Sequence, residues 1–254
     1  DFGAEVIKIE DPDKGDPLRH WRVKGHSLFW KQYARNKKSV TLNLREAEGQ
    51  ELARRLVAEA DVLVDATGEP EAGARIAMVA LQHRKTLVTM NVELEATVGP
   101  LLAYLWRASG AVYTVGLGDE PAVLCEMVDF ARALGFEVIC AGKGKNNRLD
   151  RAATRASVEA EAARWGMNPR MLAAFVDGTK TMAEMAALAN ATGLTVDRTG
   201  MHGPVANRDD LLRVFVPEAD GGILSRPGVV VYAIGDVAPG VFVVVRVRDE
   251  LTRQ

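Results

Sequence analysis

Two lysine-containing segments hold most of the residues that can do chemistry in this chain. The first, Gly-Lys-Gly-Lys-Asn-Asn at 142–147, follows an apolar run at 136–141 that is typical of a buried strand. The second, Asp-Gly-Thr-Lys-Thr-Met at 177–182, lies in a pattern rich in Met and Ala that predicts a helix. A lysine ammonium supplies three donors, and its pKa changes readily on burial. The two segments therefore predict acid–base chemistry, or the binding of a carbonyl, carboxylate or phosphate group.

The predicted catalytic residues are Lys180, Asp177, Lys143 and Lys145, and the predicted substrate contacts are Asn146, Asn147, Thr179, Glu184 and His202. Asp177, Lys180 and Glu184 can share one face of a helix, because residues three and four apart are neighbours there. His202 lies in a predicted loop, where functional residues concentrate. A solvated surface turn is the alternative for 142–147, since two lysines and two asparagines between glycines suit such a turn.

Carboxylates and thiols offer other possible chemistry. Glu126, Asp129 and Glu184 on predicted helices can supply oxygen ligands to a divalent cation. Helical carboxylates are more often solvated or capping groups, so we predict no metal site. Cys125 and Cys140 lie in apolar segments without metal-ligand spacing, and we expect reduced core thiols of a cytoplasmic protein.

The elements that must position these residues alternate between strands and helices. Strands are predicted at 5–10, 39–44, 62–66, 86–91, 111–115 and 136–141, and helices at 46–60, 70–83, 96–108, 121–134, 151–165 and 169–191. Such alternation is typical of βαβ units, so we predict an α/β fold with a Rossmann-like, mostly parallel sheet. Runs at 229–234 and 241–247 predict a β-hairpin.

We expect four parts, namely an N-terminal segment at 1–64, a Rossmann-like α/β body at 65–141, a helical catalytic and substrate insertion at 142–220 and a small β tail at 221–254. The 32 basic and 34 acidic side chains are nearly balanced, which argues against a nucleic-acid binder. The sequence has no apolar run long enough for a membrane span and no signal peptide. We expect a small-molecule substrate and no membrane partner, and leave a homo-oligomer open. The start at Asp-Phe-Gly, without Met, suggests a fragment.

Four segments in the first quarter of the chain match one known family. They are Gly-Ala-Glu-Val-Ile-Lys-Ile-Glu at 3–10, Gly-Asp-Pro-Leu-Arg at 15–19, Asn-Lys-Lys-Ser-Val-Thr-Leu-Asn-Leu at 36–44 and Ala-Asp-Val-Leu-Val at 60–64. This part resembles the N-terminal part of the family III CoA-transferases. The resemblance implies that the segment at 35–38 lies near a CoA nucleotide, and Arg and Lys suit its phosphates. The acyl-carrying Asp of that family lies well beyond such a segment and has no match here, so we expect no CoA transfer.

Eight later segments match a second family, at 65–73, 90–93, 98–102, 118–122, 142–147, 177–182, 200–204 and 238–245. They resemble the homoserine-dehydrogenase-like oxidoreductases, which include the deoxyxylulose-phosphate-reductoisomerase-like proteins with a C-terminal SAF domain. The resemblance implies NAD(P)-dependent hydride transfer on a small hydroxy or oxo acid or a sugar-phosphate-like compound. It also makes Thr67, Gly68, Asn91 and Glu93 the candidate cofactor-binding residues, with ordinary turn chemistry as the alternative.

Together the two resemblances describe a chimera whose changeover falls at 61–67. The sequence contains no G-x-G-x-x-G, the loop that lets a backbone approach a pyrophosphate at a helix N-terminus. We therefore expect NAD or NADP binding to be weak or lost, with CoA as the alternative cofactor. Three interpretations stay open, namely an impaired oxidoreductase, a CoA-transferase fragment and an inactive recombinant α/β module.

Overall fold

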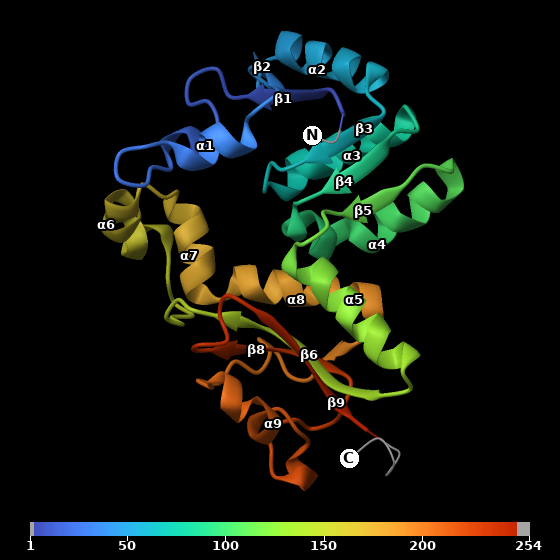
Figure 1. Cartoon of the computed structure of the whole chain (residues 1–254), viewed down its shortest axis with the longest axis vertical. Helices are drawn as coiled ribbons and strands as arrows, with labels where there is room; N and C mark the ends of the chain where they lie inside the picture. Colours follow the sequence, from blue (N-terminus) through green and yellow to red (C-terminus); the bar gives the residue numbers. More distant parts are fainter. Residues whose placement is uncertain (1–2, 248–254) are drawn as a thin grey trace. The chain divides into compact units, whose positions relative to one another are not determined.

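The computed structural model describes residues 3–247, and the chain divides into two compact units, one ending at Leu63 and one beginning at Val64 (Figure 1). Residues 1–2 of the predicted N-terminal segment and residues 248–254 of the predicted β tail lie outside the described residues.

The first unit is built on a parallel pair of strands, β1 (Val6–Glu10) and β2 (Lys37–Thr41). The connection between them contains the short 3-10 helix η1 (Pro17–His20) and α1 (Leu28–Tyr33), and α2 (Ala47–Glu59) follows β2. Glu10 is 4% exposed and accepts hydrogen bonds from Arg19 and Ser39. The Arg19 hydrogen bonds lower the pKa of Glu10, so a buried carboxylate ties the connection to both strands.

The second unit begins with a three-stranded sheet in the order β3-β4-β5. Its strands are β3 (Val62–Asp65), which starts at the boundary between the units, β4 (Thr86–Thr89) and β5 (Tyr113–Val115). The connecting helices are α3 (Pro70–Gln82) and α4 (Val92–Ser109). Asn91 caps the start of α4 by accepting from the Leu94 N–H, and Gly110 ends it in a left-handed conformation.

A four-stranded sheet in the order β7-β8-β6-β9 forms the rest of the second unit. Its strands are β6 (Glu137–Lys145), β7 (Thr195–Val196), β8 (Val229–Ile234) and β9 (Val241–Arg246). β8 is parallel to both β6 and β7, whereas β9 is antiparallel to β6. The predicted hairpin is therefore wrong, because β6 lies between β8 and β9. The predicted α/β fold with mostly parallel pairing is confirmed, although the strands are shared among three sheets.

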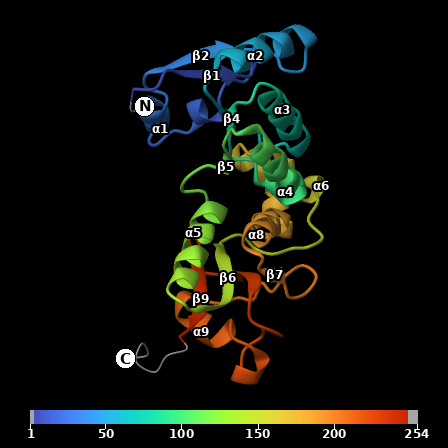
Figure 2. The same cartoon turned by 90° about the vertical axis from the view of Figure 1, so that its right-hand side faces the viewer.

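Opposite faces of the four-stranded sheet contact different layers. Alternate residues of β8 divide between them, as period-two strands require: Val230 and Tyr232 pack with α5 (Glu120–Ala133) and α8 (Thr179–Thr192), and Val231 packs with Phe215. Three short helices, η2 (Arg208–Asp210), α9 (Leu211–Val214) and η3 (Glu218–Asp220), lie in the segment that leads to β8. Figure 2 shows α5 and β6 side by side.

The helical segment after β6 consists of α6 (Arg155–Trp165), α7 (Pro169–Asp177) and α8. The single helix predicted for 169–191 is wrong, because Gly178 adopts φ 88° and separates α7 from α8. A left-handed glycine ends the first helix. α8 packs against α4, α5 and α7, and so it connects the two sheets of the second unit (Figure 1).

Candidate functional site

Lys143 and Lys145 lie on strand β6 and not in the solvated turn that we considered as the alternative. Both are buried, at 8% and 4% exposure. Glycine is required at the two positions that alternate with the lysines. A Cβ at Gly142 would collide with the Val231 backbone, and one at Gly144 would collide with Val237 and Ala238. Successive side chains of a strand point to opposite faces. Backbone therefore packs closely on the glycine face of β6, and both lysines share the other face.

Lys143 is at the centre of a buried charge cluster. Its Nζ donates to Glu120 Oε2, at the start of α5, and to Glu184 Oε2, on α8. Burial acts to lower the pKa of Lys143, but the nearby carboxylates outweigh it and raise that pKa. Burial raises the pKa of Glu184, against the opposing effect of Lys143 and Lys180. The lysine is thus held as a cation against a carboxylate that is easier to protonate than a free one.

Lys180 extends this cluster toward α4. Its Nζ lies 2.9 Å from Glu93 Oε1 and 3.9 Å from Glu184 Oε1. Glu184 therefore contacts both lysines, and a change of protonation at this carboxylate alters the field at both. The structure brings together four of the predicted site residues, namely Lys143, Lys180, Glu184 and Glu93.

Two carboxylate oxygens at this cluster have no hydrogen-bond partner among residues 3–247. They are Glu93 Oε2 and Asp119 Oδ2, and both atoms are buried. Burial raises the pKa of Asp119, while the Glu120 backbone N–H and Lys180 act against the shift. A buried acceptor left without a donor costs about 1–3 kcal/mol. A ligand hydroxyl or an ordered water that donates to these oxygens would remove that cost.

Asp119 and Glu120 were not among the site residues predicted from the sequence. Both follow β5 and begin α5, within the Gly-Asp-Glu-Pro spelling at 118–121. A proline at the second helical position and acidic side chains in the first turn mark a helix start. That signal placed the residues correctly, but it did not show that they face Lys143, which lies 23 residues after Glu120.

Lys145 has no carboxylate partner among the described residues. Its Nζ donates to the backbone carbonyls of Asn147 and Arg148, each at 2.8 Å. Burial lowers the pKa of Lys145, and nearby Arg148 lowers it further against the opposing charge of Asp177. Asn146 is exposed and Asn147 is half-buried. The lysine therefore closes the turn after β6.

Asp177 does not share a helical face with Lys180 and Glu184, contrary to our expectation. It is the last residue of α7, and its Oδ1 accepts hydrogen bonds from the backbone N–H and hydroxyl of Thr179, both at 2.7 Å. These bonds satisfy a free N–H at the start of α8. Asp177 and Thr179 thus shape the junction between the helices, and the Lys180 partner comes from α4 instead.

Asn91 joins the loop after β3 to the start of α4. Its Nδ2 donates to the Glu69 carbonyl at 2.9 Å, to Asp65 Oδ2 at 3.2 Å and to Thr67 Oγ1 at 3.3 Å. Its Oδ1 accepts from the Leu94 N–H at 3.2 Å. The side chain is completely buried and uses both its donor and its acceptor groups on protein.

The turn after β3 does not fit a dinucleotide pyrophosphate. The Thr67 N–H donates to Asp65 Oδ1 at 2.9 Å, and the Glu69 N–H donates to Thr67 Oγ1 at 3.5 Å. Pro70, the first residue of α3, has no N–H, and Glu69 places a carboxyl group at the helix start. Gly68 adopts φ 66° with open space beside it. The donors that a phosphate needs are therefore largely taken, and the nearest charge has the wrong sign.

His202 lies apart from the lysine cluster, in a constellation of its own. Its Nε2 is 2.6 Å from Asp197 Oδ2, and the same carboxylate accepts from the Ser225 backbone N–H at 3.0 Å and from the Ser225 hydroxyl. Burial acts to raise the pKa of Asp197, but the hydrogen bonds from Ser225 and His202 outweigh it and lower that pKa. Asp197 is thus held as a carboxylate that orients the imidazole.

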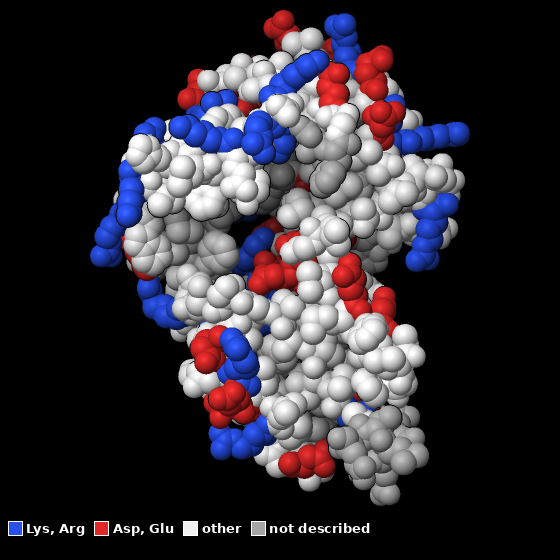
Figure 3. All heavy atoms as spheres, viewed as in Figure 1, with Lys and Arg blue, Asp and Glu red and all other residues white. Residues whose placement is uncertain are grey.

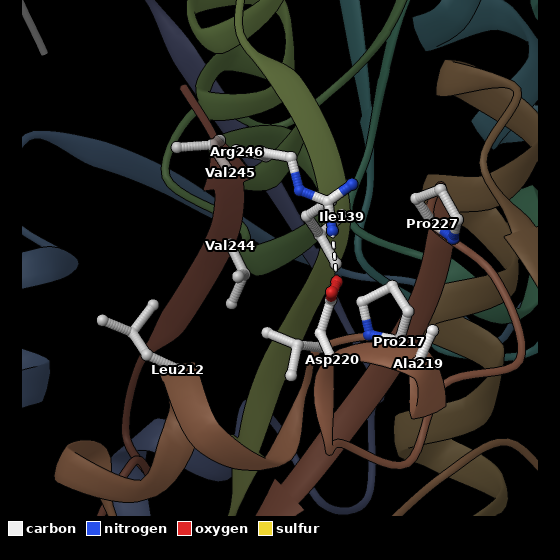
Figure 4. A pocket seen from close by; sticks show the side chains of 10 residues that line it. Ile139, Leu212, Pro217, Ala219, Asp220, Pro227, Val244, Val245 and Arg246 are labelled. Atoms are coloured by element: carbon white, nitrogen blue, oxygen red, sulfur yellow. Dashed lines mark hydrogen bonds and ion pairs between the residues drawn. The ribbon is translucent and has the colours of Figure 1, made fainter. Parts of the chain in front are cut away.

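A pocket of about 690 Å³ opens on the face of β6 and β9 that contacts η3 (Figure 4). Its walls are mostly apolar, and Arg246 at its edge forms ion pairs with Asp220 and Glu137. Because carboxylates of the chain already neutralise this arginine, the pocket offers little to a charged ligand.

Three further findings concern metal sites, membrane-spanning helices and surface charge. Among residues 3–247, no group of three or more His, Cys, Asp or Glu side chains is placed to hold a metal ion, and Glu126 and Asp129 are exposed. None of the described helices is both long and apolar enough to cross a membrane. Basic and acidic side chains are interspersed on the face drawn in Figure 3.

An α/β fold with a lysine–carboxylate cluster at a strand and two helix starts is suited to proton transfer during carbonyl or alcohol chemistry. Comparison with known families agrees with an oxidoreductase of this type. Residues 118–254 match the family described as oxidoreductase DRL, catalytic domain. This match covers more than half of the chain, and the chain belongs to that family.

Residues 1–86 match a second family, CoA-transferase family III. The chain is 56% identical over 68 residues to a succinyl-CoA–D-citramalate CoA-transferase of Chloroflexus aurantiacus, which covers 26% of this chain and 17% of the relative. It is 35% identical over 136 residues to a succinyl-CoA–L-malate CoA-transferase alpha subunit of the same organism, covering 49% of this chain and 32% of the relative. The chain thus spans less than a third of these relatives.

Among solved structures, a probable dehydrogenase from Thermotoga maritima is similar to this chain, with 11% identity and a TM-score of 0.43 over 96% of this chain and 68% of the other. The two family matches, over residues 118–254 and 1–86, confirm both resemblances that the sequence suggested.

Proposed function

We propose that the second unit contains the substrate site of a nicotinamide-dependent oxidoreductase of the homoserine-dehydrogenase-like type. Its substrate is a small hydroxy or oxo acid or a sugar-phosphate-like compound. One observation carries the proposal: two lysines and two buried carboxylate oxygens without hydrogen-bond donors occur in one cluster. A hydroxyl or carbonyl group needs such neighbouring donors and acceptors for its proton to be gained or lost.

The chain's own residues would act on the substrate oxygen. Lys143 and Lys180 supply N–H donors that polarise a carbonyl or stabilise an alkoxide. Glu93 and Asp119 supply acceptors that hold a substrate hydroxyl through its hydrogen. Glu184, in contact with both lysines, can receive or return a proton between them. We propose Lys145, Asp177, Thr179 and Asn91 as positioning residues, since their polar groups bond to the chain itself.

The expected affinity of this oxidoreductase for its nicotinamide cofactor is low. The turn at 65–70 does not fit the pyrophosphate, so we expect NAD or NADP to bind weakly or not at all. A fluorescence titration with NADPH should show no tight binding. Micromolar affinity would overturn this expectation.

CoA binding by the first unit is the second candidate, and the 56% identity to a CoA-transferase supports it. The basic segment at 35–38 contains three cationic side chains, and Arg35 and Lys37 are exposed while Lys38 pairs with Glu5. Such side chains suit the phosphates of CoA. We expect retention on immobilised CoA at most, without transfer. The third alternative is an inactive module that binds neither ligand.

A thermal-shift panel with NAD, NADPH and CoA separates these alternatives, because a ligand of the native state raises its stability. A shift that appears only at millimolar NAD or NADPH, where weak binding still stabilises the fold, supports the oxidoreductase. A shift with CoA alone supports the second candidate, and no shift with any ligand at millimolar concentration supports the inactive module. If turnover is found, Lys180→Ala should abolish it without unfolding the chain. Lys85→Ala, which changes the only lysine of the second unit not discussed above, should leave turnover unchanged. Turnover that survives Lys180→Ala would contradict the proposed site.

A further inference from the structure

A loop of the first unit, between η1 and α1, exposes several large apolar side chains to solvent. Trp21, Leu28 and Phe29 are 61%, 52% and 40% exposed, and Val23 is 42% exposed. Single apolar side chains are normal on a protein surface, whereas a group of them gathered in one place marks a binding surface. These four side chains lie in one short loop, so they call for a partner that can cover them.

Contacts within the loop hold it in a closed shape. The rings of Trp21 and Phe29 meet edge to face with their centroids 6.3 Å apart, which joins the two ends of the loop. Farther out, Val23 and His26 exchange two backbone hydrogen bonds of 2.9 and 3.0 Å. The two residues between them adopt φ 49° and 81°, as in a type I′ turn. The apolar side chains are therefore presented by a small hairpin-like loop.

Basic side chains accompany the apolar ones, and acidic side chains are absent from this part of the sequence. The segment at 18–38 contains seven Lys and Arg residues and no Asp or Glu. Two of the seven, Arg19 and Lys38, are neutralised by ion pairs with glutamates of the same unit. Arg22, Lys24 and Lys31 are exposed and form no ion pair with the carboxylates of residues 3–247. The charge of the whole chain is balanced, but the charge of this segment is not.

The side chains of this loop suit a lipid surface better than a nucleic acid, although both partners are anionic. Trp30 already has two cations over its ring, at 3.8 and 4.5 Å from the centroid, and Trp21 and Phe29 are turned edge to face. Val23 and Leu28 offer no ring on which a base can stack. Aliphatic and indole groups beside Lys and Arg instead match the interface of a bilayer. A second copy of the chain would bring like charges together.

We propose that the basic–apolar loop, residues 21–31, docks the first unit onto a membrane surface that contains anionic lipids. The apolar side chains enter the boundary between headgroups and acyl chains, and the cations stay at the anionic headgroups. We expected no membrane partner because the sequence has no spanning segment and no signal peptide, but docking of this kind needs neither. The docking is independent of the chemistry proposed for the second unit.

Sedimentation of the full chain with large vesicles tests this docking. We expect binding to vesicles of phosphatidylcholine mixed with phosphatidylserine, and much weaker binding to vesicles of phosphatidylcholine alone. Lys24→Gln/Lys31→Gln should weaken binding about 25-fold, because each cation near an anionic surface contributes about fivefold. Leu28→Ser should weaken it about fivefold, because 52% of this side chain is exposed and free to insert.

Matched changes on α2 of the same unit supply the controls. Leu52 is 39% exposed and Arg55 is exposed. Leu52→Ser and Arg55→Gln should therefore leave vesicle binding unchanged. All the substituted side chains are exposed, so we expect every variant to keep the melting temperature of the native chain, and a loss of binding then reports on the surface and not on folding.

Several results would overturn the proposal. The native chain might sediment without the vesicles that contain phosphatidylserine, or Leu28→Ser might bind them as well as the native chain does. Binding that is undiminished in about 1 M sodium chloride would show that anionic headgroups are not recognised, because the Debye length is then about 3 Å. Binding of a single-stranded oligonucleotide in place of vesicles, or a dimer that Leu28→Ser separates, would assign the loop to another partner.

Discussion

Removal of the Lys143 ammonium is the sharpest test of the buried charge cluster. In Lys143→Met the carboxylates of Glu120 and Glu184 lose their cation, and Glu184 is only 7% exposed. Breaking a buried ion pair by removing one partner costs about 3–5 kcal/mol. Because the Glu120 side chain is 35% exposed, water screens its share. We therefore expect a loss of about 3 kcal/mol in the free energy of unfolding, at the lower end of that range.

The double variant Lys143→Met/Glu184→Met supplies the internal control. Both charges are then absent from the contact, so the loss should be smaller than the sum of the single losses by about 2 kcal/mol. Since the chain has two units, global unfolding by urea need not be two-state. Hydrogen exchange of the peptide covering β6 reports on the second unit directly. Lys85→Met controls for the loss of a lysine from a half-buried position of the same unit.

Two results would refute this reasoning. The first is a Lys143→Met variant whose β6 amides exchange as slowly as those of the native chain. The second is a double variant whose loss equals the sum of the single losses, which would mean that the two side chains do not interact.

Three further predictions concern the second unit. Asn91→Ala should destabilise it by about 1–3 kcal/mol in urea unfolding, because α4 loses its cap and buried Asp65 loses a donor; an unchanged midpoint would contradict the bonds seen here. Burial raises the pKa of Glu95 in the folded state. Between the ordinary carboxyl pKa and this raised pKa, the folded state therefore binds more protons than the unfolded state, and the free energy of unfolding falls as pH rises through that range. Glu95→Gln should therefore show a higher melting temperature than the native chain near pH 7 and a smaller difference near pH 4, and it keeps the acceptor for Tyr113. Burial raises the pKa of Cys140 to about 12, so at pH 8 a thiol reagent should modify this residue only after denaturant is added. Cys125 is half-buried and should react first. Immediate modification of both thiols would show that β6 is accessible to the reagent.

The local elements were largely predictable from the sequence. Helical periodicity gave α2, α3 and α5 to within a residue or two, because their apolar faces repeat at the helical spacing. The break at Gly178 was missed although Asp177-Gly178-Thr179 contains its signal, a left-handed glycine followed by a residue that a side chain can cap. The Met and Ala residues on both sides continue the helical pattern, and so they favoured one uninterrupted helix.

Non-local pairing was not predictable in the same way. β8 and β9 are close in sequence and have the residue pattern of a hairpin, but β6, which lies far before them in the chain, is inserted between them and pairs with both. The partners of Lys143 lie 23 and 41 residues away, and no local pattern selects Glu120 or Glu184 from the other carboxylates. The alternation of Gly and Lys at 142–145 was the one available signal that these lysines belong to a strand.

This alternation also limits how the gene for this chain can change. A deletion or insertion of one residue immediately before Gly142 would turn the strand over. The ammonium groups would then point to the side of β6 where the backbones of Val231, Val237 and Ala238 leave no room even for a methyl group, and glycines would face the carboxylates. Substitutions around β6 alter single contacts, whereas a change of length by one codon there would remove the cluster entirely. We therefore expect natural variants of this segment to differ in residue type but to keep the number of residues between Phe136 and Lys145.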